Sequence, residues 1–396
     1  MSQRIVLVID THAATPNYDE SLVAALRAEG ADARLLTADF YPEPYAPASR
    51  VPGRCYFFLR LSRALRRRFR SNRHLTKLII AAQVPEYIAD LLFLLVYSAV
   101  KRPLLHFQWL FLVPIDVVFL FFVRALGLSV VYTVHNPLPH DRETGWNKLL
   151  YGAVYRLANH LVFHSQSNLD DFAGHFPTIT GKASVVPLGV AFPDRPPVDR
   201  QEARRRLGWE DNETVIVFQG QAKPYKGLDI LLRAMAGVDT DKNLRLAISA
   251  SWRFVDDRGT YRALLDAVAA KHRVENHDEV TPDDRFIDLA CACDLWACPY
   301  RTATTSFTAM AAMRYGTPVV ATATGSFPEM LGEELAEWIV PPDNVEALRD
   351  AITRFVEKSP EERAAIGKAL FERAHRKYSW STIAQKTVRI YDRLNA

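Results

Sequence analysis

Short apolar runs rich in β-branched residues alternate with amphipathic segments along most of the chain. The first run is RIVLVID at 4–10, and YDESLVAALRAEG at 18–30 follows it with helical spacing and a glycine at the expected stop position. Runs of this kind are typical of parallel strands that are buried on both faces. The alternation therefore predicts a parallel sheet with helices packed on both sides.

The alternating pattern occurs twice, with an interruption between the two series. Proline and charged residues break it after residue 190, and TVIVFQG at 214–220 opens the second series. We predict an α/β fold of two Rossmann-like doubly wound domains that face each other across a cleft. The predicted parts are a first domain over 1–190, a linker over 191–212, a second domain over 213–375, and a helix over 376–396 that returns to the first domain.

Composition excludes several classes of function. The net charge of +4 over 396 residues is small, so the whole-chain charge does not indicate nucleic acid as a partner. Three of the four cysteines lie in the apolar segment ACACDLWACPY without a nearby histidine, which favours a structural role over a metal site and fits a reducing compartment. Only five consecutive apolar residues precede Asp10, too few for the core of a signal peptide, so we expect a cytoplasmic protein.

Lysines follow the first predicted strand of the second domain. In FQGQAKPYKGLDILLRAM, Gly220 allows close backbone approach, and Lys223 and Lys226 come just before a helix that starts at Gly227. Cations beside a helix N-terminus suit a diphosphate, which carries negative charge and many acceptor oxygens. The alternative is a solvated pair of lysines in an ordinary turn.

Histidines lie at two strand ends of the first domain. LSVVYTVHNPLPHD ends a predicted strand at His135 and Asn136, and the following loop supplies His140 and Asp141. A histidine or carboxylate at a strand end can accept a proton from an attacking hydroxyl. Loop capping is the alternative for these side chains. The earlier run LLHFQWL offers a similar strand end with His106, Gln108 and Trp109, for which burial in the core is the alternative. The predicted acceptor-binding residues are Asn17, Tyr18, His106 and Asn136.

Four segments together resemble the nucleotide-sugar-dependent glycosyltransferases of family 4 and their bacterial exopolysaccharide relatives. These segments are FQGQAKPYKGLDILLRA, DLWACPYR, MRYGTPVVATATGSFPE and YSWSTIAQKTVRIY. The resemblance implies the GT-B fold, with Gly220 and Lys226 holding the donor diphosphate and His135 facing the donor sugar. Gln221 departs from the family, which often has arginine directly after that glycine.

Two alanines mark a second departure from the family. Family 4 enzymes carry two glutamates eight positions apart, and the corresponding positions here are Ala303 and Ala311. By resemblance to a subgroup that acts on lipid-linked saccharides, Thr305 and Ser306 are expected to serve the phosphates and Glu329 to remain near the nucleotide. The predicted donor-binding set is Gly220, Lys223, Lys226, Tyr300, Arg301, Thr305, Ser306 and Glu329.

The missing glutamates lead us to expect an inverting displacement, and we separately expect that no metal is required. The predicted proton acceptors are His135, His140 and Asp141, since an inverting displacement requires a base on the acceptor side. We expect no cofactor beyond the nucleotide diphosphate sugar, which is a co-substrate.

A basic segment in the first domain suggests contact with a membrane. Residues 54–77 contain nine Lys and Arg, no Asp or Glu, and apolar residues near helical spacing. A basic amphipathic helix of this kind can lie on an anionic leaflet, although an ordinary surface helix is the alternative. The apolar run over 84–127 is broken by Asp90, Lys101 and two prolines, so we expect buried or interfacial helices rather than a membrane span.

These observations predict a glycosyltransferase that moves a mannose- or glucose-type sugar from a nucleotide diphosphate to a lipid-linked saccharide. The reaction would take place on the inner face of the plasma membrane, in exopolysaccharide or glycolipid assembly. Two alternatives remain open: a catalytically silent relative that binds nucleotide sugars, and a nucleotide-sugar epimerase of the same fold.

Overall fold

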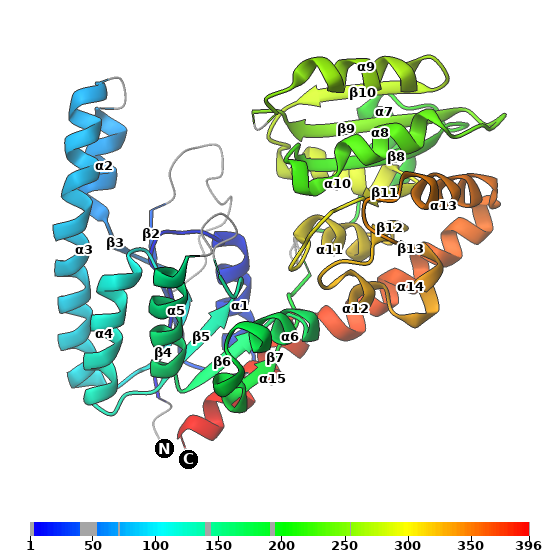
Figure 1. The fold of residues 1–396 in the computed structure, drawn as a ribbon. Helices are drawn as coiled ribbons and strands as arrows, with labels where there is room; N and C mark the ends of the chain where they lie inside the picture. Colours follow the sequence, from blue (N-terminus) through cyan, green and yellow to red (C-terminus); the bar gives the residue numbers. More distant parts are fainter. Residues whose placement is uncertain are drawn as a thin grey trace. The chain divides into compact units, whose positions relative to one another are not determined.

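The computed structural model describes residues 4–39, 54–69, 72–138, 144–190, 195–253 and 255–395. The chain forms two compact units (Figure 1). Unit 1 comprises Met1–Gly189 together with Trp380–Ala396, and unit 2 comprises Val190–Ser379. Each unit is built on one parallel sheet, as the alternating sequence pattern predicts.

The sheet of unit 1 has the strand order β3-β2-β1-β4-β5-β6-β7. Its strands are β1 Val6–Asp10, β2 Ala33–Ala38, β3 Arg54–Phe58, β4 Leu104–Trp109, β5 Val130–Val134, β6 His160–Phe163 and β7 Ala183–Val185. Its helices are α1 Pro16–Ala28, α2 Arg60–Arg68, α3 Arg73–Lys101, α4 Val113–Ala125, α5 Gly145–Leu157, α6 Gln166–His175, the 3-10 turn η1 Pro177–Lys182 and α15 Trp380–Asn395.

Alternate residues of the unit 1 strands supply two separate cores, as the two-residue period of a strand requires. In β1, Leu7 and Ile9 pack with α3, α4, α5 and α6, whereas Val6 and Val8 pack with α1 and α15. The closing helix α15 therefore belongs to unit 1, and its return to that unit confirms the expectation for the C-terminal helix.

The predicted helix over 54–77 is wrong in its extent. Residues 54–58 form β3, which pairs with β2 at the edge of the sheet. Leu59 then has φ 56°, a left-handed conformation that separates the strand from α2. A third element begins after Asn72, whose side chain accepts hydrogen bonds from the His74 and Leu75 amides. Local capping therefore divides the basic segment into a strand and two helices.

The expectation that Asp90 breaks the apolar run over 84–127 is wrong, whereas the expectation of buried or interfacial helices stays a prediction. Among the described residues, His74–Lys101 is one helix whose length and composition suffice to cross a membrane. The helix continues through Pro85. Its two acidic residues accept hydrogen bonds from backbone amides at the start of α2. Glu86 accepts from the Leu61 and Ser62 amides, and Asp90 accepts from the Leu59 amide. The carboxylates therefore cap a neighbouring helix without interrupting α3.

The sheet of unit 2 has the strand order β10-β9-β8-β11-β12-β13. Its strands are β8 Thr214–Gln221, β9 Leu244–Ser251, β10 Arg273–Asp278, β11 Leu295–Cys298, β12 Val319–Thr322 and β13 Ile339–Val340. Its helices are α7 Arg200–Leu207, η2 Pro224–Lys226, α8 Leu228–Ala236, α9 Arg258–Ala269, α10 Asp283–Ala292, α11 Phe307–Arg314, α12 Phe327–Leu331, η3 Glu333–Trp338, α13 Val345–Glu357 and α14 Pro360–Tyr378.

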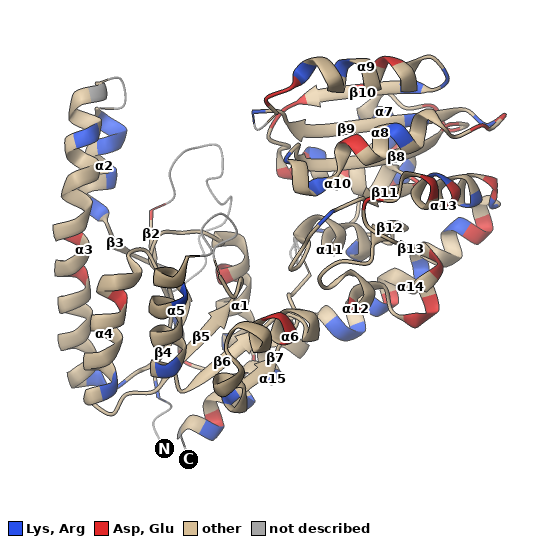
Figure 2. Cartoon of the chain, in the orientation of Figure 1, with Lys and Arg blue, Asp and Glu red and all other residues tan. Residues whose placement is uncertain are grey.

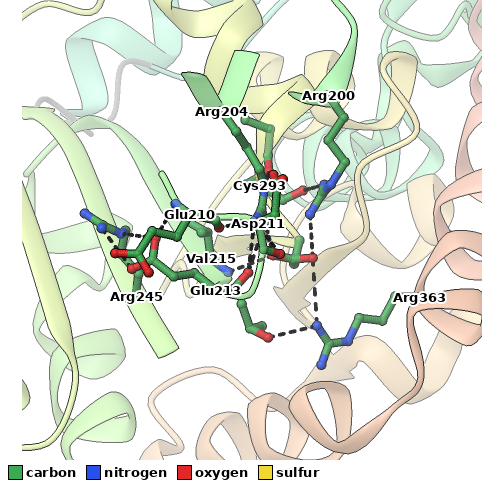
Figure 3. Close-up of polar contacts among 12 residues, drawn as sticks. Arg200, Arg204, Glu210, Asp211, Glu213, Val215, Arg245, Cys293 and Arg363 are labelled. Atoms are coloured by element: carbon green, nitrogen blue, oxygen red, sulfur yellow. Dashed lines mark hydrogen bonds and ion pairs between the residues drawn. The ribbon is translucent and has the colours of Figure 1, made fainter. Parts of the chain in front are cut away.

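The segment predicted as a linker contains a helix that is part of unit 2. Arg204 of α7 is 2% exposed, and its guanidinium donates to the carbonyls of Glu213 and Ala292 and to the Asp294 carboxylate at 2.9 Å (Figure 3). Asp294 also accepts from the Val215 amide at the start of β8. The charged residues that led to the linker prediction therefore include Arg204, whose buried hydrogen bonds attach α7 to the sheet.

Candidate functional site

Lys226 lies against the end of β8 because two glycines leave room for it. Gly220 has φ 131°, and a Cβ there would lie 2.8 Å from the Lys226 Nζ. Gly227 has φ 66°, and a Cβ there would lie 2.0 Å from the Pro299 carbonyl oxygen. Both positions therefore require glycine, and together they hold the Lys226 ammonium between the strand end and the start of α8.

The Lys226 ammonium has neutral neighbours. Its Nζ donates to the Tyr300 hydroxyl at 3.1 Å and lies 4.9 Å from the centroid of the Tyr300 ring. Burial disfavours the charge, but the Tyr300 and Tyr225 hydroxyls outweigh burial and raise the pKa of Lys226. None of the ion pairs among the described residues involves Lys226. A charged, partly buried group of this kind is suited to an anionic ligand.

Arg301 supports the turn that carries Lys226. Its guanidinium makes two hydrogen bonds of 2.8 Å to Asp229 and one of 2.7 Å to Asp343. It also donates to the Pro224 carbonyl at 2.6 Å, and its own amide donates to the Tyr225 carbonyl. The hydrogen bonds to Asp229 raise the pKa of Arg301. Since the charge is already paired, the geometry favours positioning of the turn over direct contact with the donor.

The start of α11 lies beside the same tyrosine. Ser306 caps the helix by accepting from the Ala309 amide, and the Thr308 hydroxyl lies 3.4 Å from that of Tyr300. Thr305 is half-buried in the loop before the cap. The structure therefore brings Gly220, Lys226, Tyr300 and the N-terminus of α11 together, and a helix N-terminus adds to the attraction for an anion.

The positions around the missing glutamates are well packed. Ala311 is fully buried in α11, and the Ala303 carbonyl lies against Gly325, where a Cβ would be 2.1 Å from its oxygen. Glu329 is half-buried on α12, and its carbonyl accepts from Tyr378 and Arg373. The ring of Phe327, two residues earlier, contacts Tyr300 at 5.3 Å. Glu329 and Lys223 stay predictions as donor ligands.

Polar side chains at the ends of β9 and β10 in unit 2 were not predicted from the sequence. The Ser249 hydroxyl donates to the Glu279 carboxylate at 2.8 Å and lies 2.8 Å from the Thr281 hydroxyl, and the Gln219 side-chain amide donates to Thr281 at 3.0 Å. The Gln219 Oε1 is buried without a hydrogen-bond partner in the described part of the chain. These polar groups lie beside the end of β8. The strand order β10-β9-β8 brings them there, and that order could not be predicted from the sequence.

His106, predicted as an acceptor ligand, is a core residue. It is 1% exposed, its Nδ1 lies 2.6 Å from the Tyr391 hydroxyl and its Nε2 lies 2.8 Å from the Thr133 hydroxyl. Burial lowers the pKa of His106 to about 3. Both ring nitrogens are occupied in joining β4, β5 and α15, so the structure argues against acceptor contact through this side chain.

His135 is held in one orientation by its neighbours. Its ring stacks on Trp109 with centroids 4.6 Å apart and an interplanar angle of 4°, and its Nε2 lies 3.3 Å from the Gln108 Oε1. Burial, with smaller effects of His164 and His106, lowers the pKa of His135 well below its ordinary value. Since Gln108 Oε1 accepts the Nε2 proton, Nδ1 of the neutral ring is the proton-accepting nitrogen.

His12 is a residue that the sequence interpretation missed. It lies two residues after the end of β1, its Nδ1 lies 4.0 Å from the Asp10 carboxylate, and its ring meets that of Trp109 edge-on at 6.1 Å. Burial lowers the pKa of His12, and Asp10 opposes that effect. The pairing of β1 with β4 places His12 beside the Trp109 and His135 stack. The signal was present in DTHAATP, a strand-end histidine two residues after an aspartate.

The remaining predicted residues of unit 1 divide into three groups. Tyr18 is buried against Trp380, with ring contacts to His135 and His164. Asn17 is exposed and Asn136 is half-buried at the β5 end. His140 and Asp141 lie outside the described residues. The described part of the chain contains no group of three His, Cys, Asp or Glu side chains suited to a metal, and the metal-free reaction stays a prediction.

Comparison with known families identifies the second unit. Residues 199–373 match the family described as glycosyl transferases group 1. A mannosyltransferase from Mycolicibacterium hassiacum, named MMP alpha-(1->4)-mannosyltransferase, is 27% identical over 68% of this chain and 67% of its own length. The D-inositol 3-phosphate glycosyltransferase of Corynebacterium aurimucosum is 28% identical over 67% of this chain and 64% of its own length.

Solved structures match the whole chain at lower identity. The complex of Anabaena HepE with UDP gives a TM-score of 0.71 at 18% identity, covering 98% of this chain and 100% of that one. WaaG, a glycosyltransferase involved in lipopolysaccharide biosynthesis, gives 0.63 at 15% identity, covering 98% and 99%. The expected GT-B fold is confirmed. Taken together with the group 1 match, it defines the chain as a glycosyltransferase enzyme of the GT-B class.

Proposed function

We propose that the protein transfers a sugar from a nucleoside diphosphate sugar to a hydroxyl group of a lipid-linked saccharide. The observation that carries the proposal is Lys226, a charged ammonium with neutral partners at the carboxyl end of β8. Parallel sheets of doubly wound domains bind ligands at that edge, and diphosphates bind at helix N-termini. The known complex of HepE with UDP, and the mannosyltransferase among the relatives, support a nucleotide donor and a mannose- or glucose-type sugar.

In the donor half of the proposed reaction, unit 2 stabilises the leaving diphosphate. Lys226 would contact a phosphate oxygen, and backbone amides at the start of α11 would contact others. Arg301 stabilises the turn that carries Lys226 by donating a hydrogen bond to the Pro224 carbonyl. As the bond to the sugar breaks, negative charge grows on the diphosphate, so a fixed cation lowers the barrier to that step.

In the acceptor half, a neutral histidine of unit 1 would take the acceptor proton. His135 offers Nδ1 from a ring fixed by Trp109 and Gln108, and His12 offers an imidazole next to Asp10. Asp141 and His140 remain candidates from the sequence. With alanines at 303 and 311, we propose direct displacement with inversion and without a metal. The name of the Mycolicibacterium relative gives its own product an α linkage, so NMR of the product linkage is the decisive readout.

The lipid-linked acceptor and a location at the inner face of the plasma membrane belong to the same proposal. The basic segment of α2 and the apolar helix α3 support it, as does the lipopolysaccharide role of the structural neighbour WaaG. A lipid-linked substrate is confined to the bilayer surface, so an enzyme that acts on it gains from being held there. Exopolysaccharide or glycolipid assembly is the process that would use such a product.

Incubation with radiolabelled UDP-, GDP- and dTDP-sugars and a membrane lipid extract tests the proposal. We expect label from one donor to move into the organic phase, and Lys226→Ala to reduce the transfer. A changed sugar nucleotide without lipid labelling would indicate an epimerase. Binding without turnover would indicate a silent relative, and either result would overturn the proposed transfer.

A further inference from the structure

The outward surface of α3 and α4 is apolar without interruption. From Leu78 to Val100, every exposed residue of α3 is apolar, and the same holds for the exposed residues of α4. Leu92, Phe93 and Val96 are 59 to 65% exposed, and Phe121 is 59% exposed. The two helices pack against each other, and Figure 2 shows both ribbons free of charge over most of their length. We call this surface, formed by exposed residues of 78–100 and 114–125, the α3–α4 face.

The opposite side of α3 is part of the unit 1 core. Tyr87, Leu91 and Leu94 are buried in the cluster beneath the sheet, and the Tyr87 hydroxyl donates to the buried Asp116 of α4 at 2.5 Å. Glu86 and Asp90 are committed to the N-terminus of α2. A helix that crossed a bilayer would have to abandon these contacts, so α3 is fixed along the surface of the domain.

Cations border the α3–α4 face. At one end lie α2, with five arginines and no acidic residue, and Lys77; at the other end lie Lys101 and Arg102. Arg60, Arg67 and Arg68 are exposed. An apolar surface bordered by cations matches the boundary between the acyl chains and the headgroups of an anionic membrane, because the apolar side chains enter the acyl region and the cations meet phosphates.

We propose that unit 1 binds an anionic bilayer through the α3–α4 face, with α3 lying in the membrane plane and α2 on the headgroups. The partner is the lipid surface itself. The inference deepens the proposed function, on whose lipid-linked acceptor its purpose rests. It also changes the predicted mode of attachment. The basic segment over 54–77 was expected to supply both the charge and the apolar contact, whereas here α3 and α4 make the apolar contact and the basic segment supplies the charge.

Depth measurement distinguishes a helix in the membrane plane from a helix that spans the membrane. Cys55 and Cys291 are first replaced by serine, since the other two cysteines are buried. Single cysteines at Leu78, Leu92 and Val100 are then labelled with a fluorophore, and quenching is measured with nitroxide lipids of graded depth. The vesicles contain phosphatidylcholine and about one third phosphatidylglycerol. We expect one shared depth of roughly 5 to 10 Å below the headgroups at all three positions.

Other depth profiles would overturn the proposal. A label at Leu92 near the bilayer centre, with those at Leu78 and Val100 at the two surfaces, would show a spanning helix. Absence of quenching would show that lipid does not cover the face. Labels shielded without vesicles, together with a doubled mass in sedimentation, would show that a second copy covers it.

Charge placed on the face should abolish vesicle binding without affecting the donor site. The triple variant Leu92→Asp, Val96→Asp, Phe121→Asp should bind vesicles at least about tenfold more weakly. The matched control is Val280→Asp with Phe371→Asp in unit 2, whose side chains are 38% and 40% exposed. The control should bind vesicles like the wild type, and equal loss in both variants would refute the assignment of the face.

Two further measurements, of nucleoside diphosphate affinity and of binding to anionic and neutral vesicles, distinguish a failure of this inference from a failure of the proposed function. Nucleoside diphosphate affinity should be unchanged in the triple variant, so a failure of vesicle binding alone leaves the donor assignment standing. Changing Arg66, Arg67 and Arg68 to Glu should reduce binding to anionic vesicles and leave binding to neutral vesicles unaltered. Unaltered binding to both kinds of vesicle would remove α2 from the interface.

Discussion

Replacing Lys226 by methionine isolates the contribution of one ammonium group to donor binding. Methionine keeps an unbranched side chain along Gly220 and removes only the charge and the hydrogen bond to Tyr300. A charge-assisted contact with a phosphate is worth roughly 1.5 to 3 kcal/mol. The dissociation constant of the matching nucleoside diphosphate should therefore rise about ten- to a hundred-fold. Lys226→Ala should have an effect of the same size.

The thermal stability of the same variant provides an independent readout. The wild-type ammonium is partly buried beside neutral hydroxyl groups, and the ion pairs among the described residues do not include it. Its removal should leave the melting temperature of the ligand-free protein the same or higher, because functional charges of this kind are held at a cost to stability. Lys226→Met should thus lose affinity without losing stability.

Isothermal calorimetry with GDP, UDP and dTDP, at low and moderate salt, measures the effect. Lys223→Met, in the same turn, is the matched control, and we expect it to weaken binding less than Lys226→Met does. Unchanged affinity in Lys226→Met would refute the assignment of the diphosphate site. A large fall in melting temperature would instead show that Lys226 is mainly structural.

Four other predictions concern stability, acid sensitivity, the proton acceptor and the stereochemistry of transfer. Arg204→Ala should destabilise unit 2 by about 2 to 4 kcal/mol because the buried carbonyls of Glu213 and Ala292 lose their donor, although Arg200 still pairs with Asp294. Arg205→Ala on the exposed side of α7 should have a much smaller effect, and chemical denaturation compares the two variants. Burial lowers the pKa of His164 to about 4, so its contribution to stability is complete above pH 6.5 and is lost as the pH falls; His164→Asn should flatten that slope by up to about 1.4 kcal/mol per pH unit in denaturation curves from pH 4 to 6.5. His135→Ala and His12→Ala should be compared for turnover at saturating donor: the variant that lacks the proton acceptor should be about a hundred- to ten-thousand-fold slower, and full activity in both would exclude both as bases. NMR of the wild-type product should show inversion, and retention of the donor configuration would contradict direct displacement.

The strand and helix alternation was sufficient to predict the fold. β1, β5, β8 and β12 fall within runs rich in β-branched residues, and β4 falls within the apolar run LLHFQWL. The short or polar strands β3 and β10 escaped recognition, because pairing with a neighbouring strand stabilises them more than their own composition does. The helix α7 was mistaken for linker, since its arginines look solvated until Asp294, about ninety residues later, is brought beside them.

The geometry of the candidate donor site was more predictable than that of the candidate acceptor site. Gly220, Lys226 and Gly227 are close in sequence, and local turn geometry joins them. Arg301 was predicted as a donor ligand, and its positioning role could not be foreseen, because its pairing with Asp229 depends on the order of β8 and β11. His106 and His135 look alike as strand-end histidines, and only the position of Tyr391 on the returning α15 separates a core residue from a candidate base.

The stoichiometry of product formation tests the central claim most directly. Purified protein is incubated with its preferred nucleotide sugar and membrane lipid extract, and released nucleoside diphosphate and labelled lipid are measured in the same reaction. Glycosyl transfer predicts equal amounts of the two, dependence on the lipid extract, and a matched loss of both in Lys226→Met at low donor concentration. Release of nucleoside diphosphate without labelled lipid, or labelled lipid formed equally well by Lys226→Met, would contradict the account.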